Sequence, residues 1–288
     1  MRRRLLAAAL LVAAGTLGYG TYVLAGLPAR DEVRALAGKN PGKTGVMRQR
    51  EEEAKAKGRR PRVVQTWIPL ERVSRNLIQA VIASEDQKFF GHDGVDWQAI
   101  QESVEANVTK RQSLRGGSTI TQQLAKNLFF DTRKSLTRKV REMIVTHWLE
   151  QDLSKGRILA LYLNVIEWGD GIYGCEAAAR SYYDKSAFEL TVTEAAGLVA
   201  MIPNPRRINP QVSPARHARA QRRVLWLMAG AGYIQKEVAG LGAEPPSEAP
   251  EPEADTEPEA GTEPEAGSEP PAGPAPEPGS EPGVGRER

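Results

Sequence analysis

The feature that most constrains this chain is a run of 23 residues near its N-terminus that contains no charged side chain. The run, residues 5–27, reads LLAAALLVAAGTLGYGTYVLAGL and follows the basic tip MRRR. At about 1.5 Å per residue, a helix of this length spans about 34 Å, enough to cross a hydrocarbon core of about 30 Å. The positive-inside rule keeps the tip in the cytoplasm, so everything after residue 27 is expected outside it.

A cleaved signal peptide is the alternative to a membrane anchor, because it also joins a basic tip to an apolar stretch. The run is longer than the apolar core of a typical signal peptide, and its end shows no convincing small-x-small cleavage pattern. We therefore assign residues 1–27 to a cytoplasmic tip and an uncleaved transmembrane anchor.

The C-terminal segment, residues 243–288, is predicted to be disordered. It repeats Pro, Glu, Ala and Gly and contains one Val and no other large apolar residue, so it cannot bury enough surface to offset the entropy of ordering. It holds 13 of the 36 acids and 2 of the 39 bases, which leaves residues 1–242 with 37 bases, 23 acids and a net charge of +14. A positively charged protein with a membrane anchor is expected to bind anionic lipid or a phosphorylated substrate rather than nucleic acid.

Between anchor and tail we expect a stalk over residues 28–61 and one folded domain over residues 62–242. No segment alternates apolar and polar residues for long, so the fold class is predicted to be mainly α. Helices are expected at residues 70–84, 95–108, 118–130, 135–153, 156–166, 174–183, 191–202 and 213–231. Thr193 is expected to cap the helix at 191–202. In the helix at 135–153, one side is apolar and carries Leu136, Val140, Met143, Ile144 and Trp148.

The first stretch with chemical potential is EDQKFFGHDG at residues 85–94. Glu85 and Asp86 end an apolar helix and are followed by aromatic residues and a glycine turn. At the edge of an apolar surface the charged form of a carboxylate is disfavoured, which suits a general base. Ordinary polarity at a helix end is the alternative interpretation.

Three further stretches have both functional and structural explanations. GGSTITQQLAKN at 116–127 opens a helix with free N–H groups and hydroxyls, which suits sugars or phosphates but also an ordinary capped helix. RKVRE at 138–142 is a cationic cluster or a simple i,i+4 ion pair. KGRILALYLN at 155–164, with EWGDG at 167–171, is typical of a sugar-binding surface or of packing and tight turns.

In order and spacing, these stretches resemble the motifs of the family 51 peptidoglycan glycosyltransferases. The five similar segments are EDQKFFGHDG (85–94), GGSTITQQLAKN (116–127), RKVRE (138–142), KGRILALYLN (155–164) and EAAGLVAMIPNP (194–205). The likeness covers about residues 60–235, and the stalk and anchor look most like those of monofunctional members.

The resemblance implies a lysozyme-like helical domain with a smaller, partly membrane-embedded lobe at residues 95–115, including Trp97 and Ile100. It also implies that the chain polymerises lipid II. The 4-hydroxyl of an acceptor GlcNAc attacks the anomeric carbon of the donor with inversion, forms a β-1,4 link and releases undecaprenyl pyrophosphate. The implied partners are lipid II, the growing strand, membrane lipid and other cell-wall synthesis proteins, at the outer face of the inner membrane.

The same resemblance implies roles for single residues. Glu85 corresponds to the catalytic base, and Asp86 would support it. Glu142 corresponds to a second essential Glu near the donor pyrophosphate, where it holds basic residues in place or helps to bind a divalent cation such as Mg or Mn. Lys126 would neutralise the leaving pyrophosphate. The other expected substrate contacts are Ser118, Gln122, Asn127, Arg138, Lys139 and Lys155.

One position departs from the family pattern. The family has an Arg eight residues after the conserved Lys, whereas this chain has Lys134 there and Arg133 just before it. A Lys is only a point charge and cannot make a bidentate contact with phosphate. We therefore expect Arg133 to substitute for the missing Arg.

Three other functions remain as alternatives. A lysozyme-like hydrolase would act on the same polymer with a pair of carboxylates, but it has no need for a cationic cluster. A non-catalytic scaffold would be expected to lack Glu85 or Glu142, and both are present. A bifunctional enzyme with transpeptidase activity would need an S-x-x-K motif, which this sequence does not contain.

Overall fold

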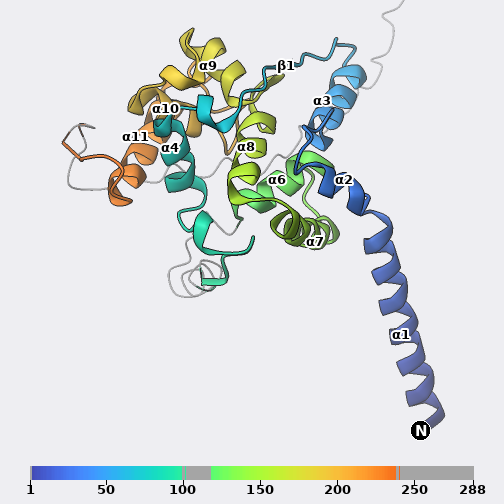
Figure 1. Ribbon diagram of the computed structural model, residues 1–288. Coiled ribbons are helices and arrows are strands. Elements are labelled where there is room, and N and C mark those ends of the chain that lie inside the picture. The colour runs from blue at the N-terminus through green and yellow to red at the C-terminus, as the bar shows by residue number, and fades with distance from the viewer. Residues whose placement is uncertain (1, 99–100, 102–117, 238–239, 241–288) are drawn as a thin grey trace, which may run out of the picture. The chain divides into compact units, whose positions relative to one another are not determined.

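The computed structural model describes residues 2–98, 101, 118–237 and 240 (Figure 1). Helices dominate these residues, which confirms the predicted mainly α fold. The tail at 243–288, Ile100 and most of the helix predicted at 95–108 lie outside the described residues. The domain boundaries given above stay predictions.

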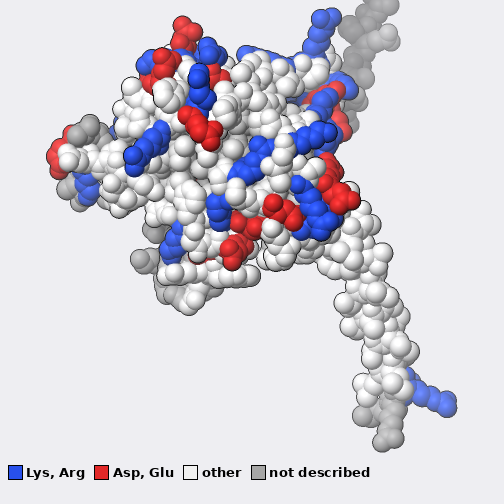
Figure 2. All heavy atoms as spheres, in the orientation of Figure 1, with Lys and Arg blue, Asp and Glu red and all other residues white. Residues whose placement is uncertain are grey.

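The N-terminal helix α1 (Arg2–Ala25) covers most of the apolar run. Among the described residues it is the one helix long and apolar enough to cross a membrane. Its large side chains, including Leu11 and Leu17, are exposed, and Figure 2 shows it uncharged along its length with basic side chains at its tip. An exposed apolar helix of this length needs an apolar medium around it, which a bilayer supplies.

The core of the domain is built from two groups of packed helices. In the first group, α4 (Arg75–Glu85) packs against α10 (Val192–Val199) and α11 (Pro214–Gly230). In the second, α6 (Ile120–Phe129) packs against both α7 (Leu136–Asp152) and α8 (Lys155–Val165). One continuous apolar cluster joins the groups, and its largest fully buried side chains include Trp168, Tyr162, Phe89, Leu77 and Ile120.

A small three-stranded sheet, not predicted from the sequence, covers one end of α8. Its strands are β1 (Val64–Gln65), β2 (Glu167–Gly169) and β3 (Ile172–Tyr173). The order is β1-β3-β2, with β1 parallel and β2 antiparallel to β3. Strands of two or three residues are too short to show an alternating pattern in a sequence. The next helix, α9 (Cys175–Tyr183), begins directly after β3.

The segment predicted as a stalk contains two helices that pack against the domain. Val33 of α2 (Arg30–Ala35) and the neighbouring Leu36 belong to the main apolar cluster, and α2 contacts α7. The second helix, α3 (Gly45–Ala56), contacts α6. A Cβ added to Gly45 would lie 2.7 Å from the backbone N of Phe130, so α3 approaches the end of α6 backbone to backbone.

Two helices differ in detail from their predictions. The cap of α10 is Thr191, not Thr193, because Thr191 and Glu194 form a capping box. The apolar side of α7 is only partly used for packing. Leu136, Val140 and Met143 are 86%, 40% and 37% exposed, although they were grouped with the apolar side of that helix.

Candidate active site

Glu85 is the last residue of α4, and the packing of this helix fixes its position. Ser74 caps the first turn by accepting a hydrogen bond from the backbone N–H of Leu77, and Leu77 and Val81 are fully buried. Glu85 is half-buried where this apolar face ends. It is a carboxylate at the edge of the core, the environment predicted for a general base.

Side-chain donors orient the Glu85 carboxylate. Nε2 of Gln123 in α6 donates to Oε2 at 2.9 Å, and Oγ of Ser84 donates to Oε1 at 3.2 Å. The hydroxyl of Tyr162 in α8 donates to Oε1 of Gln123 at 2.9 Å. Because that oxygen is the acceptor, the amide NH2 group faces Glu85. Three helices therefore fix the direction in which one carboxylate points.

The hydroxyl of Tyr162 remains protonated in this arrangement. Burial is the main cause that raises its pKa well above the ordinary value, and the charges of Glu85 and Asp86 raise it further. The protonated hydroxyl can therefore donate to Gln123, while the carboxylate of Glu85 can only accept, and these two ends set the direction of the hydrogen bonds from Tyr162 to Glu85.

Asp86 holds the start of α6. Its Oδ2 accepts a 3.0 Å hydrogen bond from the backbone N–H of Ile120, the first residue of α6. Its Oδ1 lies 2.9 Å from Nε2 of His92, and the backbone N–H of Gly94 donates to Nδ1 of the same ring at 3.1 Å. Since Nδ1 is an acceptor, Nε2 carries the proton that binds Asp86. Asp86 thus positions the helix that carries Gln123 and Lys126.

Lys126 is close enough to Glu85 and Glu142, the two carboxylates that the sequence singled out, for both charges to act on it. Burial, the largest effect, lowers its pKa, and the charges of Arg138 and Lys139 lower it further. The charges of Glu142 and Glu85 act in the opposite direction, so both carboxylates are near this ammonium group. The net result is a lysine whose charged form is less favoured than usual.

Glu142 is the centre of an ion cluster on α7. Its side chain is 4% exposed, accepts a hydrogen bond from Nη1 of Arg138 and has an oxygen 3.7 Å from Nζ of Lys139. Burial is the main cause that lowers the pKa of Lys139. Glu142 therefore collects cations next to Lys126.

Polar groups at the start of α6 complete the site. Nζ of Lys139 donates to Oγ of Ser118 at 2.9 Å and to Oε1 of Gln122 at 3.2 Å. Nδ2 of Asn127 donates to the backbone oxygen of Gln123 at 2.8 Å. Ser118 and Gln122 thus lie beside the cations, whereas Asn127 is occupied within its own helix.

Sequence comparison places the chain in a family. Residues 52–229 of the 288 match the family model described as Transglycosylase, which is more than half of the chain. The chain belongs to the transglycosylase family. This membership confirms the resemblance drawn from the five motifs.

Two bacterial relatives agree with this assignment. The transglycosylase is 48% identical over 183 residues to the biosynthetic peptidoglycan transglycosylase of Aromatoleum aromaticum, covering 64% of this chain and 80% of the relative. It is 52% identical over 167 residues to the protein of the same name in Dechloromonas aromatica, covering 58% and 72%. A crystal structure of penicillin-binding protein 1A from Haemophilus influenzae is similar at 22% identity with a TM-score of 0.36, covering 62% of this chain and 17% of that chain.

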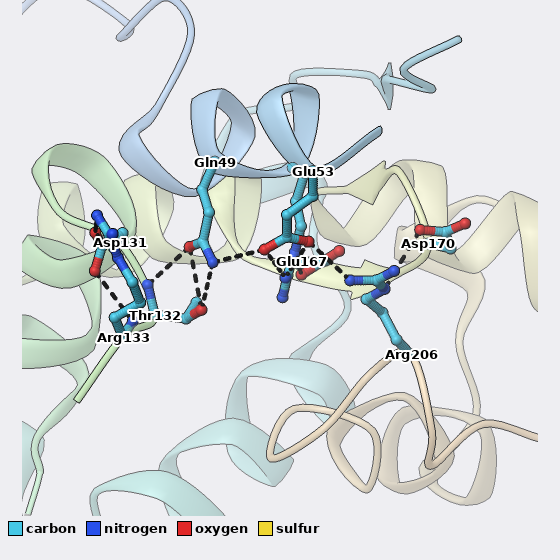
Figure 3. A network of polar contacts seen from close by, with 9 residues as sticks. Gln49, Glu53, Asp131, Thr132, Arg133, Glu167, Asp170 and Arg206 are labelled. Carbon is cyan, nitrogen blue, oxygen red and sulfur yellow. Dashed lines mark hydrogen bonds and ion pairs between the residues drawn. The ribbon is translucent and has the colours of Figure 1, made fainter. Parts of the chain in front are cut away.

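Three cations expected at the transglycosylase site point elsewhere. Arg133 is 84% exposed and donates to Asp131, as Figure 3 shows, and Lys134 is exposed. Nζ of Lys155 lies 2.8 Å from Oε1 of Glu150 and 4.7 Å from the centre of the Phe89 ring. Arg138, which donates to the buried Glu142, is thus the arginine that belongs to the ion cluster, whereas Arg133 pairs with Asp131 at the surface.

No role was predicted for Gln123, Tyr162 or His92, which the structure places around Glu85 and Asp86. For Gln123 a signal existed, because it lies three residues before Lys126 and therefore on the same face of α6. No such signal existed for Tyr162, since its partner is 39 positions away in the chain.

The described residues do not fit a divalent cation at this transglycosylase site. In that part of the chain no three His, Cys, Asp or Glu side chains group together as a metal site. The carboxylate of Glu142 is engaged by Arg138 and Lys139, whose charges would repel a cation. The expected Mg or Mn stays a prediction, and no chemical step is assigned to it.

Proposed function

We propose that this transglycosylase polymerises lipid II into β-1,4-linked glycan strands and releases undecaprenyl pyrophosphate. One observation carries the proposal: α6, the helix of Lys126, is bonded through Gln123 to Glu85 and through Gln122 to Lys139, which pairs with Glu142. A proton acceptor and an anion-binding cluster thus lie along the same helix, which also carries Lys126. Joining a sugar hydroxyl to a sugar diphosphate needs both.

The reaction follows from the two halves of the site. Glu85 removes the proton from the 4-hydroxyl of the acceptor GlcNAc as its oxygen bonds to the anomeric carbon of the donor. The bond from that carbon to the pyrophosphate oxygen breaks with its electron pair, so the leaving group gains negative charge. Attack opposite the leaving group inverts the anomeric centre. Lys126, Arg138 and Lys139 stabilise the charge that develops.

The state of Lys126 before substrate binds supports this assignment. Burial and neighbouring cations make its charge unfavourable, and its pKa is lowered. A diphosphate placed beside it adds negative charge to that of Glu142, which favours the charged form of Lys126. Substrate binding is therefore favoured by relief of repulsion among cations that are already in place.

The same proposal includes the membrane topology and the limits of the activity. The tip before α1 lies in the cytoplasm and the domain on the outer side of the inner membrane, where lipid II is presented. Because the sequence lacks S-x-x-K, the chain forms strands without cross-linking them.

The test is to incubate the detergent-solubilised full chain with labelled lipid II and separate the products on a gel. We expect a ladder of glycan polymer. A turbidity assay on purified cell walls runs in parallel and distinguishes the hydrolase. Clearing of the walls without polymer from lipid II would contradict the proposal.

A further inference from the structure

A pocket of about 270 Å³ lies beside α8, between this helix, the segment after α2 and the residues before the 3-10 helix Leu70–Arg72. Ala160 is one of its lining residues and precedes Tyr162 by two positions, which is about 200° around the helix. Tyr162 donates to Gln123 at the proposed active site. The pocket and the active site therefore lie on different sides of α8.

Arg157 lines this pocket as a cation without a counter-charge. Its Nε donates to the backbone oxygen of Leu36 at 2.7 Å, and its Nη2 donates to the backbone oxygen of Lys39 and to Oδ1 of Asn40, each at 3.0 Å. These acceptors are neutral, so they fix the guanidinium without balancing its charge. Burial lowers the pKa of Arg157, and within the described part of the chain no carboxylate pairs with it.

The side-chain groups of the pocket that remain free are hydrogen-bond donors. Nη1 of Arg157 has no partner among the described residues, and the same holds for the indole N–H of Trp67. The oxygen of the Asn40 amide accepts from Arg157, so its NH2 group is the part left for a ligand. The amide of Asn164 is occupied, because it accepts from the backbone N–H of Ile68 and donates to the backbone oxygen of the same residue.

This set of groups matches a carboxylate. A carboxylate only accepts hydrogen bonds, and it carries the charge that Arg157 lacks beside it. Hydrogen bonds between a guanidinium and a carboxylate are charge-assisted and stronger than neutral ones. Ile68, Pro69 and Ala160 add apolar surface to the same pocket. The pocket is thus suited to a carboxylate with an apolar neighbour.

We propose that this pocket binds an acidic peptide segment of a partner protein. The carboxylate of a Glu or Asp would pair with Arg157, and an adjacent apolar side chain would contact Trp67 and Ile68. The volume is below the range of about 300–1,000 Å³ typical of small-molecule sites, so it suits one or two side chains rather than a whole cofactor. Trp67 is half-buried and Asn40 is exposed, so an extended segment can reach the pocket from the surface.

The peptide of lipid II also carries carboxylates and is the competing ligand. It is attached to sugars that, in the proposed mechanism, react beside Glu85 on another side of α8 from this pocket. A separate protein is therefore favoured. Binding is measured without lipid II, so a failure of this inference is distinct from a failure of polymerisation.

The test uses the full chain in detergent micelles with its five tryptophans replaced by 5-fluorotryptophan. The Trp67→Phe variant identifies the fluorine resonance of Trp67. The acetylated tripeptide amide Ile-Glu-Val is titrated, followed by its uncharged counterpart Ile-Gln-Val and the free cell-wall pentapeptide. Asn40→Asp keeps the size of the side chain but places a carboxylate beside Arg157, where it would repel the ligand. Gln211→Glu adds the same charge at an exposed residue outside the pocket and is the matched control.

We expect Ile-Glu-Val to shift the Trp67 resonance in the unsubstituted chain and in Gln211→Glu, and Ile-Gln-Val to leave it in place. Asn40→Asp should raise the Kd for Ile-Glu-Val about tenfold or more, because like charges then meet in the pocket. Equal shifts by the two tripeptides, or no shift by either, overturn the inference without any variant. An unchanged Kd in a folded Asn40→Asp protein also overturns it, and tighter binding of the cell-wall pentapeptide overturns the assignment to a partner protein.

Discussion

At the scale of single residues, the orientation of the Gln123 amide determines whether a hydrogen-bond donor or an acceptor faces the carboxylate of Glu85. A glutamine amide has a donor at one side and an acceptor at the other. The hydroxyl of Tyr162 occupies the acceptor, so the donor is directed at the carboxylate. The carboxylate of Glu85 is thereby held in one position before substrate binds. In the proposed mechanism this positioning increases the rate of proton transfer from the acceptor hydroxyl.

Replacing Tyr162 with Phe removes only this hydroxyl. The Gln123 oxygen would lose its partner in a buried site, and the amide would be free to turn its oxygen towards Glu85. We expect kcat/KM for polymerisation to fall about 5- to 30-fold, as for a loss of about 1–2 kcal/mol. The control is Tyr233→Phe at an exposed tyrosine. Equal rates for the two variants would remove Gln123 from the catalytic arrangement.

From the lowered pKa of Lys126 we predict that kcat/KM for polymerisation depends on pH. In the proposed mechanism the charge of Lys126 holds the diphosphate, and its pKa is lowered from the ordinary 10.5. As pH rises through this lowered pKa the charge is lost, so kcat/KM should decline on the alkaline side below pH 10.5. Lys126→Arg keeps its charge at higher pH and should move the alkaline limb upward, whereas Lys57→Arg should not. If the alkaline limb of the kcat/KM profile stayed at the same pH in Lys126→Arg, a group other than Lys126 would be responsible for the decline.

The residues that we propose for the chemistry could be picked out from the sequence, whereas the residues that position them could not. Glu85, Lys126 and Glu142 stand in recognisable segments of the sequence. Tyr162 acts through a hydrogen bond across 39 positions, which no local pattern reveals. Arg133 was favoured because of its distance from Lys126 along the chain, yet it pairs with Asp131 while Arg138 faces the cluster.

At the scale of elements, α3 is attached to the domain in two ways: its backbone at Gly45 packs against the backbone of Phe130, and its side chains join a polar network. Figure 3 shows Gln49 of α3 next to Thr132 and Glu53 of α3 next to Arg206. Gln49 accepts from the backbone N–H of Thr132 at 2.8 Å, and Glu53 lies 3.2 Å from Nη1 of Arg206. The segment that reads as a polar stalk is thus fastened to the loop after α6 and to the turn after α10.

Gly45→Ala tests this attachment. The new Cβ would lie 2.7 Å from the backbone N of Phe130 and 2.9 Å from the carbonyl carbon of Phe129. Backbone atoms cannot move aside as a side chain does, so α3 must shift, and we expect a destabilisation of about 1–3 kcal/mol and a lower Tm. Gly42→Ala, which has nothing within 4 Å, is the control. A Tm unchanged in both would mean that α3 does not depend on this contact.

Element prediction succeeded where the periodic pattern was long and failed where it was short. The helices α4, α6 and α7 were anticipated because each has at least ten residues with helical spacing. The strands were missed because none exceeds three residues. The exposure of Leu136 could not be predicted either, because helical spacing shows which residues share a face of the helix but not whether that face is covered.

At the scale of the whole molecule, the C-terminal end of the family match and the start of the acidic segment fall at different residues. The match ends at residue 229, whereas the acidic segment with 13 acids and 2 bases begins at residue 243. The predicted disorder of that segment implies that the domain folds and works without it. Ending the chain after Gly242 should therefore leave the Tm and the rate of polymerisation unchanged. A lower Tm would show that the segment packs on the domain.

The most direct test of the central claim is the rate of strand synthesis by Glu85→Gln. The amide keeps the size of the side chain but cannot accept the hydroxyl proton, so the account predicts loss of polymer with Tm and membrane attachment unchanged. Glu71→Gln, at an exposed Glu in the 3-10 helix Leu70–Arg72, should make polymer at the normal rate. Near-normal strand synthesis by Glu85→Gln would contradict the account.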